Sequence, residues 1–178
     1  MSQPRRTVCV IESAGQPATE VLGEVLAPLL QAGDVLILSG DLGAGKTQLT
    51  KGIARGLGVV EAVTSPTFNI LLLHEGRLPL YHFDLYRLET AEQLEDLDYW
   101  GTLEADGVGV VEWGDRFADA LPIDGVIVSI AVTGDDTRRL ELSVLGARGG
   151  ELVTQWAAAA TGVQGATVLP VPDSGGTP

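Results

Sequence analysis

The feature that most constrains the fold is a glycine-rich segment, GDLGAGKT, at residues 40–47. It fits the pattern G-x-x-x-x-G-K-[ST], in which backbone N–H groups and a helix N-terminus converge on a chain of phosphates. The pattern has this meaning only where it leaves a buried strand and enters a helix. Its flanking segments therefore decide between a phosphate-binding loop and an ordinary glycine-rich turn with a solvated lysine.

Both flanking segments have the required patterns. Residues 34–39 form a continuous apolar run, as expected of a parallel strand that is covered on both faces. After Gly45, apolar side chains recur at helical spacing until glycines give a stop signal. This order predicts a phosphate-binding loop in which Lys46 contacts the β- and γ-phosphates and the Thr47 hydroxyl binds Mg²⁺. The expected nucleotide contacts of the segment are Asp41, Leu42, Gly43, Ala44, Gly45, Lys46, Thr47 and Gln48.

The remaining patterns complete an α/β fold. Residues 69–74 and 78–83 are close enough in sequence to form a hairpin, and residues 126–132 and 139–144 alternate like an antiparallel pair. We expect a single P-loop NTPase-like domain with a mixed, mostly parallel central sheet, flanking helices and a C-terminal antiparallel strand pair. Further strands are predicted at residues 8–11 and 108–112, and further helices at 20–30, 91–97 and 151–160.

The domain is predicted to span residues 1–160. A chain of 178 residues suits one domain, and its composition changes beyond Thr161. Residues 161–178 are rich in Gly, Pro, Ala and Thr, which bury too little surface to offset the entropy lost on ordering. These residues are therefore expected to form a mobile C-terminal tail.

Charge limits the partners of the chain. Its 24 acidic and 11 basic residues give a net charge of -13, which repels phosphate backbones and anionic membranes. We expect no DNA partner and no membrane association, since no apolar stretch approaches the roughly 20 residues that cross a bilayer. The first residues lack the apolar core of a secretory signal, and Cys9 alone cannot form an internal disulfide. The expected location is cytoplasmic.

A phosphate loop needs a second magnesium anchor, usually an acid at the carboxyl end of a neighbouring buried strand. Glu112 ends the apolar run at 108–112, and Asp84 follows the strand at 78–83. The pattern favours Glu112 but leaves both acids as candidates, with a surface cap as the alternative for either. Residues 64–67, TSPT, lie between helix and strand, where switch segments that sense a γ-phosphate occur. An ordinary turn is the alternative there.

The nucleotide and the reaction are narrowed by elimination. Guanine-specific GTPases use an [NT]-K-x-D segment, but no lysine follows Lys51, so this route to GTP specificity is excluded. Sparse arginines disfavour the arginine-bearing lid of a small-molecule kinase, which remains a third possibility. Trp113 offers an aromatic surface for a base, and His82 is either a structural histidine or a proton shuttle. The two leading hypotheses are an ATPase and a nucleotide-gated binding module with incidental hydrolysis.

Four segments, in this order and spacing, resemble the bacterial TsaE (YjeE) family. They are GDLGAGKT at 40–47, TSPTF at 64–68, YHFDLYRL at 81–88 and VEW at 111–113. The combination of HxDxYR with a phosphate loop is far more specific than the loop alone, and the similarity covers roughly residues 8–144. The chain departs from the family pattern after Trp113, where a proline is common and Gly114 stands here.

The resemblance implies a compact α/β fold, ATP with Mg²⁺, and weak hydrolysis that becomes useful when the protein docks on the TsaB and TsaD partners. In this family, the protein and these partners belong to the machinery that makes N6-threonylcarbamoyladenosine at position 37 of tRNAs that read codons beginning with A. This chain would reset the complex between catalytic turnovers. Because the chain is acidic, we expect basic partners to hold the tRNA, which it would contact only indirectly.

The resemblance also assigns roles to residues. Glu112 matches the magnesium-associated acid, and Asp84 matches the acid that hydrolysis needs. Thr67 lies in the switch-like segment, and Trp113 matches the aromatic near the base. The expected catalytic residues are thus Lys46, Thr67, Asp84 and Glu112, the expected metal ligands Thr47, Asp84 and Glu112, and the further nucleotide contacts Thr19, Arg138 and Arg139.

Overall fold

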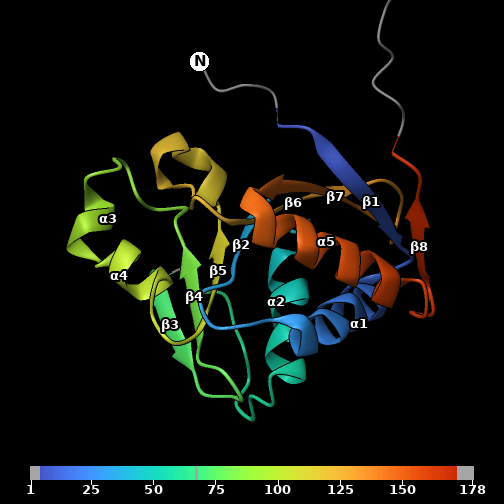
Figure 1. Cartoon of the computed structure of the whole chain (residues 1–178), viewed down its shortest axis with the longest axis horizontal. Helices are drawn as coiled ribbons and strands as arrows, with labels where there is room; N and C mark the ends of the chain where they lie inside the picture. The colour runs from blue at the N-terminus through green and yellow to red at the C-terminus, as the bar shows by residue number, and fades with distance from the viewer. Residues whose placement is uncertain (1–4, 67, 172–178) are drawn as a thin grey trace, which may run out of the picture.

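The computed structural model describes residues 5–66 and 68–171 and has one eight-stranded sheet at its centre (Figure 1). The strands are β1 Thr7–Ser13, β2 Val35–Ser39, β3 Leu71–His74, β4 Leu80–Asp84, β5 Val108–Glu112, β6 Gly125–Val132, β7 Arg138–Leu145 and β8 Ala166–Leu169. Their order across the sheet is β3-β4-β5-β2-β6-β7-β1-β8. The glycine-rich loop follows β2, which therefore places it at the middle of the sheet.

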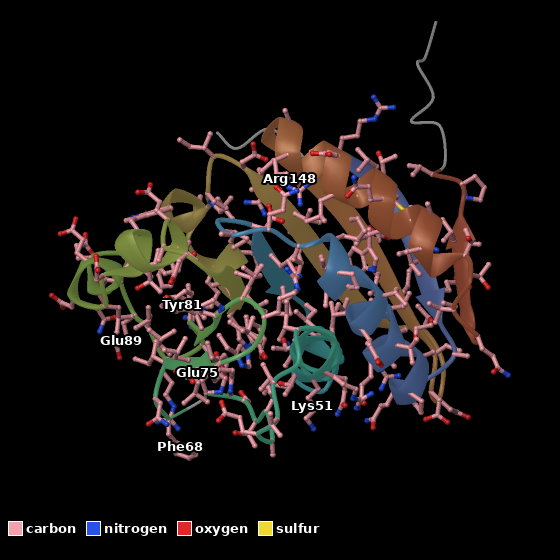
Figure 2. All side chains as sticks on the ribbon, turned by 60° about the horizontal axis from the view of Figure 1, so that its bottom comes forward. Lys51, Phe68, Glu75, Tyr81, Glu89 and Arg148 are labelled. Atoms are coloured by element: carbon pink, nitrogen blue, oxygen red, sulfur yellow. The ribbon has the colours of Figure 1, made fainter. Side chains whose placement is uncertain are left out.

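Helices cover both faces of the sheet. They are α1 Gln16–Leu26, α2 Lys46–Gly56, α3 Gln93–Asp96, α4 Tyr99–Leu103 and α5 Gly146–Ala160, with short 3-10 helices η1 Ala27–Leu29, η2 Gly114–Arg116 and η3 Ala118–Ala120. Helices α1, α2 and α5 lie on one face, and α3 and α4 on the other (Figure 1). In Figure 2, Arg148 on α5 and Glu89 in the segment before α3 lie far apart in the molecule. Within the described residues, no helix is long and apolar enough to cross a membrane.

Strand β2 shows why the apolar run before the loop is continuous. All five of its residues are buried, because both faces of the strand are covered. Leu36 and Leu38 pack into the core under α1, α2 and α5, whereas Val35 and Ile37 pack into the second core with Tyr99 of α4. The predicted parallel strand is confirmed by its pairing with β5 on one side and β6 on the other.

The sheet combines a parallel centre with antiparallel margins. Three pairings are parallel, β4–β5, β5–β2 and β2–β6, and four are antiparallel, β3–β4, β6–β7, β7–β1 and β1–β8. The predicted mixed sheet, the hairpin and the C-terminal antiparallel pair are confirmed. The expectation of a mostly parallel sheet is wrong in its proportion, because β1 and β8 join the antiparallel side.

The predicted mobile tail is also corrected by the structure. Strand β8 pairs with β1 from Val10↔Leu169 to Ser13↔Ala166, and the Ala14 amide donates to the Gly165 carbonyl at 2.8 Å. The segment also buries apolar side chains, because Val163 is part of the core and Ala166 and Val168 pack against it. The folded domain therefore continues past residue 160, and residues 172–178 lie outside the described part.

Three predicted helices differ in their bounds, and one of them, α5, begins at Gly146 rather than at residue 151. Helix α1 begins at Gln16 rather than near residue 20, because proline suits the first turn of a helix. The predicted helix at 91–97 is confirmed over α3, Gln93–Asp96, and a second short helix, α4, follows after Leu97 and Asp98, the latter in a left-handed conformation with φ 47°. Since that conformation interrupts helical hydrogen bonding, one continuous helix does not form there.

Close packing of α1 against α2 holds the helix that follows the loop. A Cβ atom on Gly52 of α2 would lie 1.8 Å from the Glu20 carbonyl oxygen, and one on Gly23 of α1 would lie 2.4 Å from the Leu49 carbonyl oxygen. Only glycine allows this approach of the two backbones. The packing fixes the position of α2, and with it the loop at its N-terminus.

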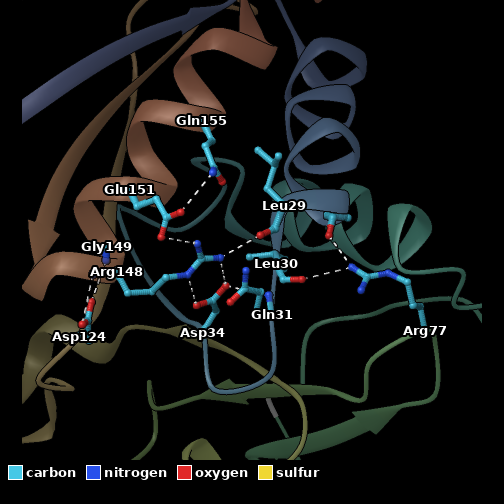
Figure 3. Close-up of polar contacts among 11 residues, drawn as sticks. Leu29, Leu30, Gln31, Asp34, Arg77, Asp124, Arg148, Gly149, Glu151 and Gln155 are labelled. Carbon is cyan, nitrogen blue, oxygen red and sulfur yellow. Dashed lines mark hydrogen bonds and ion pairs between the residues drawn. The ribbon is translucent and has the colours of Figure 1, made fainter.

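A polar network ties the opposite end of the sheet together (Figure 3). Arg148 of α5 binds Asp34 through two nitrogens, Nε to Oδ1 at 2.9 Å and Nη2 to Oδ2 at 2.7 Å, and also donates to the Leu29 carbonyl at 2.9 Å. Asp124 caps the start of α5 by accepting from the Gly149 amide at 2.7 Å. These contacts anchor α5 and the start of β2, and they lie away from the loop.

Candidate functional site

A cavity of about 330 Å³ lies at the carboxyl ends of the parallel strands. This is where ligands bind in open α/β sheets, because loops and helix N-termini converge there. The glycine-rich segment contributes Leu42, Gly43, Gly45, Lys46, Thr47 and Gln48, the strand ends contribute Asp84, Glu112 and Trp113, and Gln16, Ser65 and Tyr86 complete the wall. The cavity therefore unites the loop with both predicted acids.

The loop has the backbone shape of a phosphate cradle. Gly43 and Gly45 have φ values of 79° and 118°, a left-handed region that side chains with a Cβ rarely adopt. Helix α2 begins at Lys46, directly after the loop. The first N–H groups of a helix have no intrahelical acceptor, so they are available to an anion at this point.

Lys46 lies at the floor of the cavity. It is only 5% exposed, and its ammonium donates to the carbonyls of Gly40 at 2.6 Å and Asp41 at 2.9 Å. Burial lowers the pKa of the Lys46 ammonium, while nearby carboxylates, Glu112 foremost, act in the opposite direction. The hydrogen-bond partners of the Lys46 ammonium are neutral carbonyls, and the group is buried. Because electrostatic attraction is stronger away from water, the ammonium favours an incoming anion such as phosphate.

Glu112 lies beside Thr47, so two of the three predicted metal ligands are in contact. Glu112 is 3% exposed, and its Oε1 accepts a hydrogen bond from the Thr47 hydroxyl at 3.1 Å. Nε2 of His82 lies 2.8 Å from the same oxygen. A hydroxyl and a carboxylate side by side are the hard oxygen donors that Mg²⁺ prefers. The residues present therefore fit a magnesium ion held by Thr47 and Glu112.

Asp84 is the neighbour of Glu112 across the sheet. The parallel strands β4 and β5 pair with Asp84 opposite Glu112, so the two carboxylates project from adjacent strand ends. Oδ1 of Asp84 accepts from the Tyr86 amide at 2.9 Å, and Oδ2 accepts from the Ser65 hydroxyl at 3.1 Å. Asp84 thus joins the cavity to the predicted switch segment. Thr67, also predicted there, lies outside the described residues.

Trp113 covers the lysine end of the cavity. Its ring centroid is 4.2 Å from the Lys46 ammonium and 5.0 Å from the Tyr86 ring. The residue adopts a left-handed φ of 61°, which is uncommon for a tryptophan and turns the chain directly after Glu112. The structure places the ring beside the group expected to hold the terminal phosphates, and its predicted contact with a base stays a prediction.

The three further predicted nucleotide contacts, Thr19, Arg138 and Arg139, have different surroundings in the structure. Arg138 reaches the loop, where its Nε donates to the Ala44 carbonyl at 3.0 Å. The Thr19 hydroxyl is buried and bonded to Ser13 and the Gly15 carbonyl, and Arg139 pairs with Glu12 and Glu141. None of the three residues, Thr19, Arg138 and Arg139, lines the cavity.

Three residues of the cavity wall were not among the predicted site residues. Ser65 and Tyr86 lie inside segments that the sequence had singled out, residues 64–67 and 81–88, so the signal was present at the level of the motif. Gln16 precedes a proline at the start of α1, and an earlier predicted helix start would have brought it to attention.

Comparisons with known proteins agree on one family. The sequence matches the family model described as "Threonylcarbamoyl adenosine biosynthesis protein TsaE" over residues 13–140, a range that contains every residue of the cavity wall. It is similar to the tRNA threonylcarbamoyladenosine biosynthesis protein TsaE of Treponema pallidum, 43% identical over 135 residues that cover 76% of this chain and 98% of the relative. The Bacillus subtilis protein of the same name is 42% identical over 131 residues, 73% of this chain and 82% of the relative.

The fold is also similar to a solved structure. The crystal structure of Bacillus subtilis YdiB matches with a TM-score of 0.73 and 32% identity. The match covers 88% of this chain and 98% of that chain. The arrangement of the whole domain, and not the loop alone, is therefore shared.

Proposed function

The chain belongs to the TsaE family of tRNA threonylcarbamoyladenosine biosynthesis proteins, and from this premise we propose that it binds ATP with Mg²⁺ and hydrolyses it. The observation that carries the proposal is the contact of the Thr47 hydroxyl with Glu112, at 3.1 Å, beside the buried Lys46. A phosphate-binding lysine, a metal-binding hydroxyl and a strand-end acid are the three parts that a P-loop nucleotide site requires.

The loop and Lys46 account for binding. N–H groups of the loop and of the first turn of α2 donate to the phosphate oxygens. The Lys46 ammonium exchanges its two carbonyl partners for phosphate oxygens, which gives it a charged acceptor in a buried setting. Thr47 and Glu112 would hold Mg²⁺, which would further neutralise the charge of the phosphates.

Asp84 accounts for hydrolysis. Its carboxylate stands next to Glu112 and is held by the Tyr86 amide and the Ser65 hydroxyl, so its orientation is fixed. In this position it orients a water molecule for attack on the γ-phosphorus and accepts a proton from it as ADP leaves. Because phosphoryl transfer depends on positioning and charge neutralisation, a fixed carboxylate is the contribution expected of the protein.

The proposed pathway role is to act on the TsaB–TsaD complex in the cytoplasm, for modification of position 37 in tRNAs that read codons beginning with A. Support comes from the family and from the net charge of -13. An acidic chain binds an RNA backbone poorly, so basic partner surfaces hold the tRNA while this chain resets the complex.

The direct test is ATP hydrolysis by the purified chain, measured with and without TsaB and TsaD. We expect slow hydrolysis that the partners accelerate and that requires Mg²⁺. Hydrolysis that is absent under both conditions would refute the ATPase assignment.

A second candidate function is a nucleotide-gated binding module. The hydrogen bond between Ser65 and Asp84 favours it, because that bond links the cavity to the segment at 64–66, which would sense the nucleotide. An Asp84→Ala variant separates the two functions. If it binds ATP and partners but cannot support repeated tRNA modification, hydrolysis is the function; full modification would favour the gated module.

A further inference from the structure

Two buried histidines lie under the helix that follows the loop. His74 on β3 and His82 on β4 are 4% and 0% exposed, and their ring centroids are 6.2 Å apart. The antiparallel register pairs His74 with Leu80, two residues before His82. Side chains two residues apart on a strand share a face, so both rings point to the face that α2 covers.

Each imidazole uses one nitrogen on a carboxylate and leaves the other without a partner. His74 Nδ1 lies 2.8 Å from Oε1 of Glu61, and His82 Nε2 lies 2.8 Å from Oε1 of Glu112. Among the described residues, His74 Nε2 and His82 Nδ1 are buried and have no hydrogen-bond partner. A buried polar atom of this kind disfavours folding, because it loses its hydrogen bonds to water.

The contact of His82 Nε2 with Glu112 explains why an imidazole stands at this position. An apolar side chain would fill the same space without an unpartnered atom, so packing alone does not call for histidine. A carboxylate accepts hydrogen bonds, so His82 Nε2–H donates to Oε1 of Glu112. The Thr47 hydroxyl donates to this same oxygen. Two donors from different elements therefore fix the carboxylate, and neither engages Oε2.

We propose that His82 is a positioning residue for magnesium: by holding Oε1 of Glu112, it keeps the carboxylate beside Thr47 in the orientation that binds the ion. The inference rests on the proposed ATP and Mg²⁺ site and adds a residue to it. Hydrogen-bond partners of metal ligands typically contribute about 10- to 100-fold to metal affinity. An effect of this size is expected from His82, although its ring does not line the cavity.

The test measures the magnesium requirement of ATP binding. Calorimetric titrations with ATP at a series of Mg²⁺ concentrations, and in EDTA, separate the metal-dependent part of the affinity from the rest. For His82→Leu we expect the half-saturating Mg²⁺ concentration to rise about 10- to 100-fold. The affinity for ATP in EDTA should not fall, because the His82 ring does not line the cavity.

Rescue variants distinguish positioning from a general structural role. The amide nitrogen of His82→Gln can reach Glu112 as Nε2 does, so this variant should keep most of the magnesium affinity. The shorter side chain of His82→Asn places its amide nitrogen too far away, and this variant should resemble His82→Leu. If His82→Leu unfolds, the comparison of the glutamine and asparagine variants decides the question.

His74→Leu is the matched control. His74 is on the same face, is nearly as buried and has the same kind of unpartnered nitrogen, but its carboxylate partner Glu61 is 58% exposed and outside the cavity. The magnesium requirement of this variant should equal that of the wild type. The inference is overturned if His82→Leu keeps the wild-type requirement, or if His74→Leu raises it equally. If the wild type does not bind ATP with Mg²⁺, the proposed function itself fails.

Discussion

The parallel centre of the sheet and its antiparallel margin bury different kinds of side chain. The strand ends and loop at the centre bury three charged residues, Lys46, Asp84 and Glu112, around one cavity. The margin, formed by β6, β7, β1 and β8 with α5, buries apolar side chains such as Trp156 and Leu152. Buried charges disfavour folding unless they are paired, whereas buried apolar surface stabilises it.

The difference indicates that the parallel centre carries the nucleotide site, whereas the antiparallel margin contributes mainly to stability. Substitutions at the centre should change the handling of nucleotide more than the free energy of unfolding. Substitutions in the margin should do the reverse. Four predictions test this separation.

Lys46→Ala should have the largest effect on function. The variant loses the ammonium that is buried at the loop. Each hydrogen bond from this charged group to a phosphate oxygen would contribute about 1.5–3 kcal/mol to ATP binding. ATP hydrolysis should fall below detection while the thermal unfolding midpoint stays near that of the wild type. Lys51→Ala is the control, since this lysine of α2 does not line the cavity and points away from the sheet (Figure 2). Undiminished hydrolysis by Lys46→Ala would contradict the placement of the nucleotide site at the centre of the sheet.

Asp84→Asn should slow hydrolysis by about 10²- to 10⁴-fold, the usual contribution of a general base. The amide keeps the shape of the carboxylate but cannot accept a proton, so ATP affinity should stay within a few-fold of the wild type. Single-turnover hydrolysis and calorimetric binding measure the two quantities. Wild-type turnover in this variant would remove Asp84 from the chemistry.

Trp156→Ala should lower the free energy of unfolding by about 3–5 kcal/mol, as is typical of large-to-small changes in a core. The Trp156 side chain is 0% exposed, and its Nε1 donates to the Leu22 carbonyl at 2.9 Å. Urea unfolding followed by circular dichroism measures the loss. ATP affinity of the folded fraction should be unchanged, and a comparable loss of affinity would show that the two regions are not separable.

Removal of residues 166–178 should have the smallest effect. It deletes β8, an edge strand whose backbone hydrogen bonds, at about 1 kcal/mol each, are largely offset by the entropy lost when the strand orders. We expect a loss of about 1 kcal/mol, which corresponds to a fall of roughly 2–4 °C in the unfolding midpoint. An unchanged midpoint in differential scanning calorimetry would restore the prediction of a mobile tail.

The central region could be predicted from sequence because its signals are local. The loop motif, the apolar run of β2 and the acids at two strand ends each occupy a few consecutive residues. Parallel strands align their carboxyl ends at one edge, so Asp84 and Glu112 were expected near the loop, and the register places them opposite one another. The proposed division of labour between the two acids rests on their hydrogen-bond partners, which the sequence does not show.

The margin and the outlying contacts could not be predicted because they depend on distant partners. Strand β8 exists through its pairing with β1, which lies at the other end of the chain. Arg138 and Arg139 are adjacent in sequence, yet one reaches the loop and the other pairs with Glu12, because neighbouring side chains of a strand face opposite ways. The role of His82 likewise depends on Glu112, thirty residues away.

The most direct test of the account is calorimetric titration of the purified chain with ATP in the presence of Mg²⁺. A cavity built from the loop, Lys46, Thr47 and Glu112 predicts saturable binding at one site per chain, weakened when Mg²⁺ is replaced by EDTA. The absence of binding heat at millimolar ATP, from a protein shown to be folded, would contradict it.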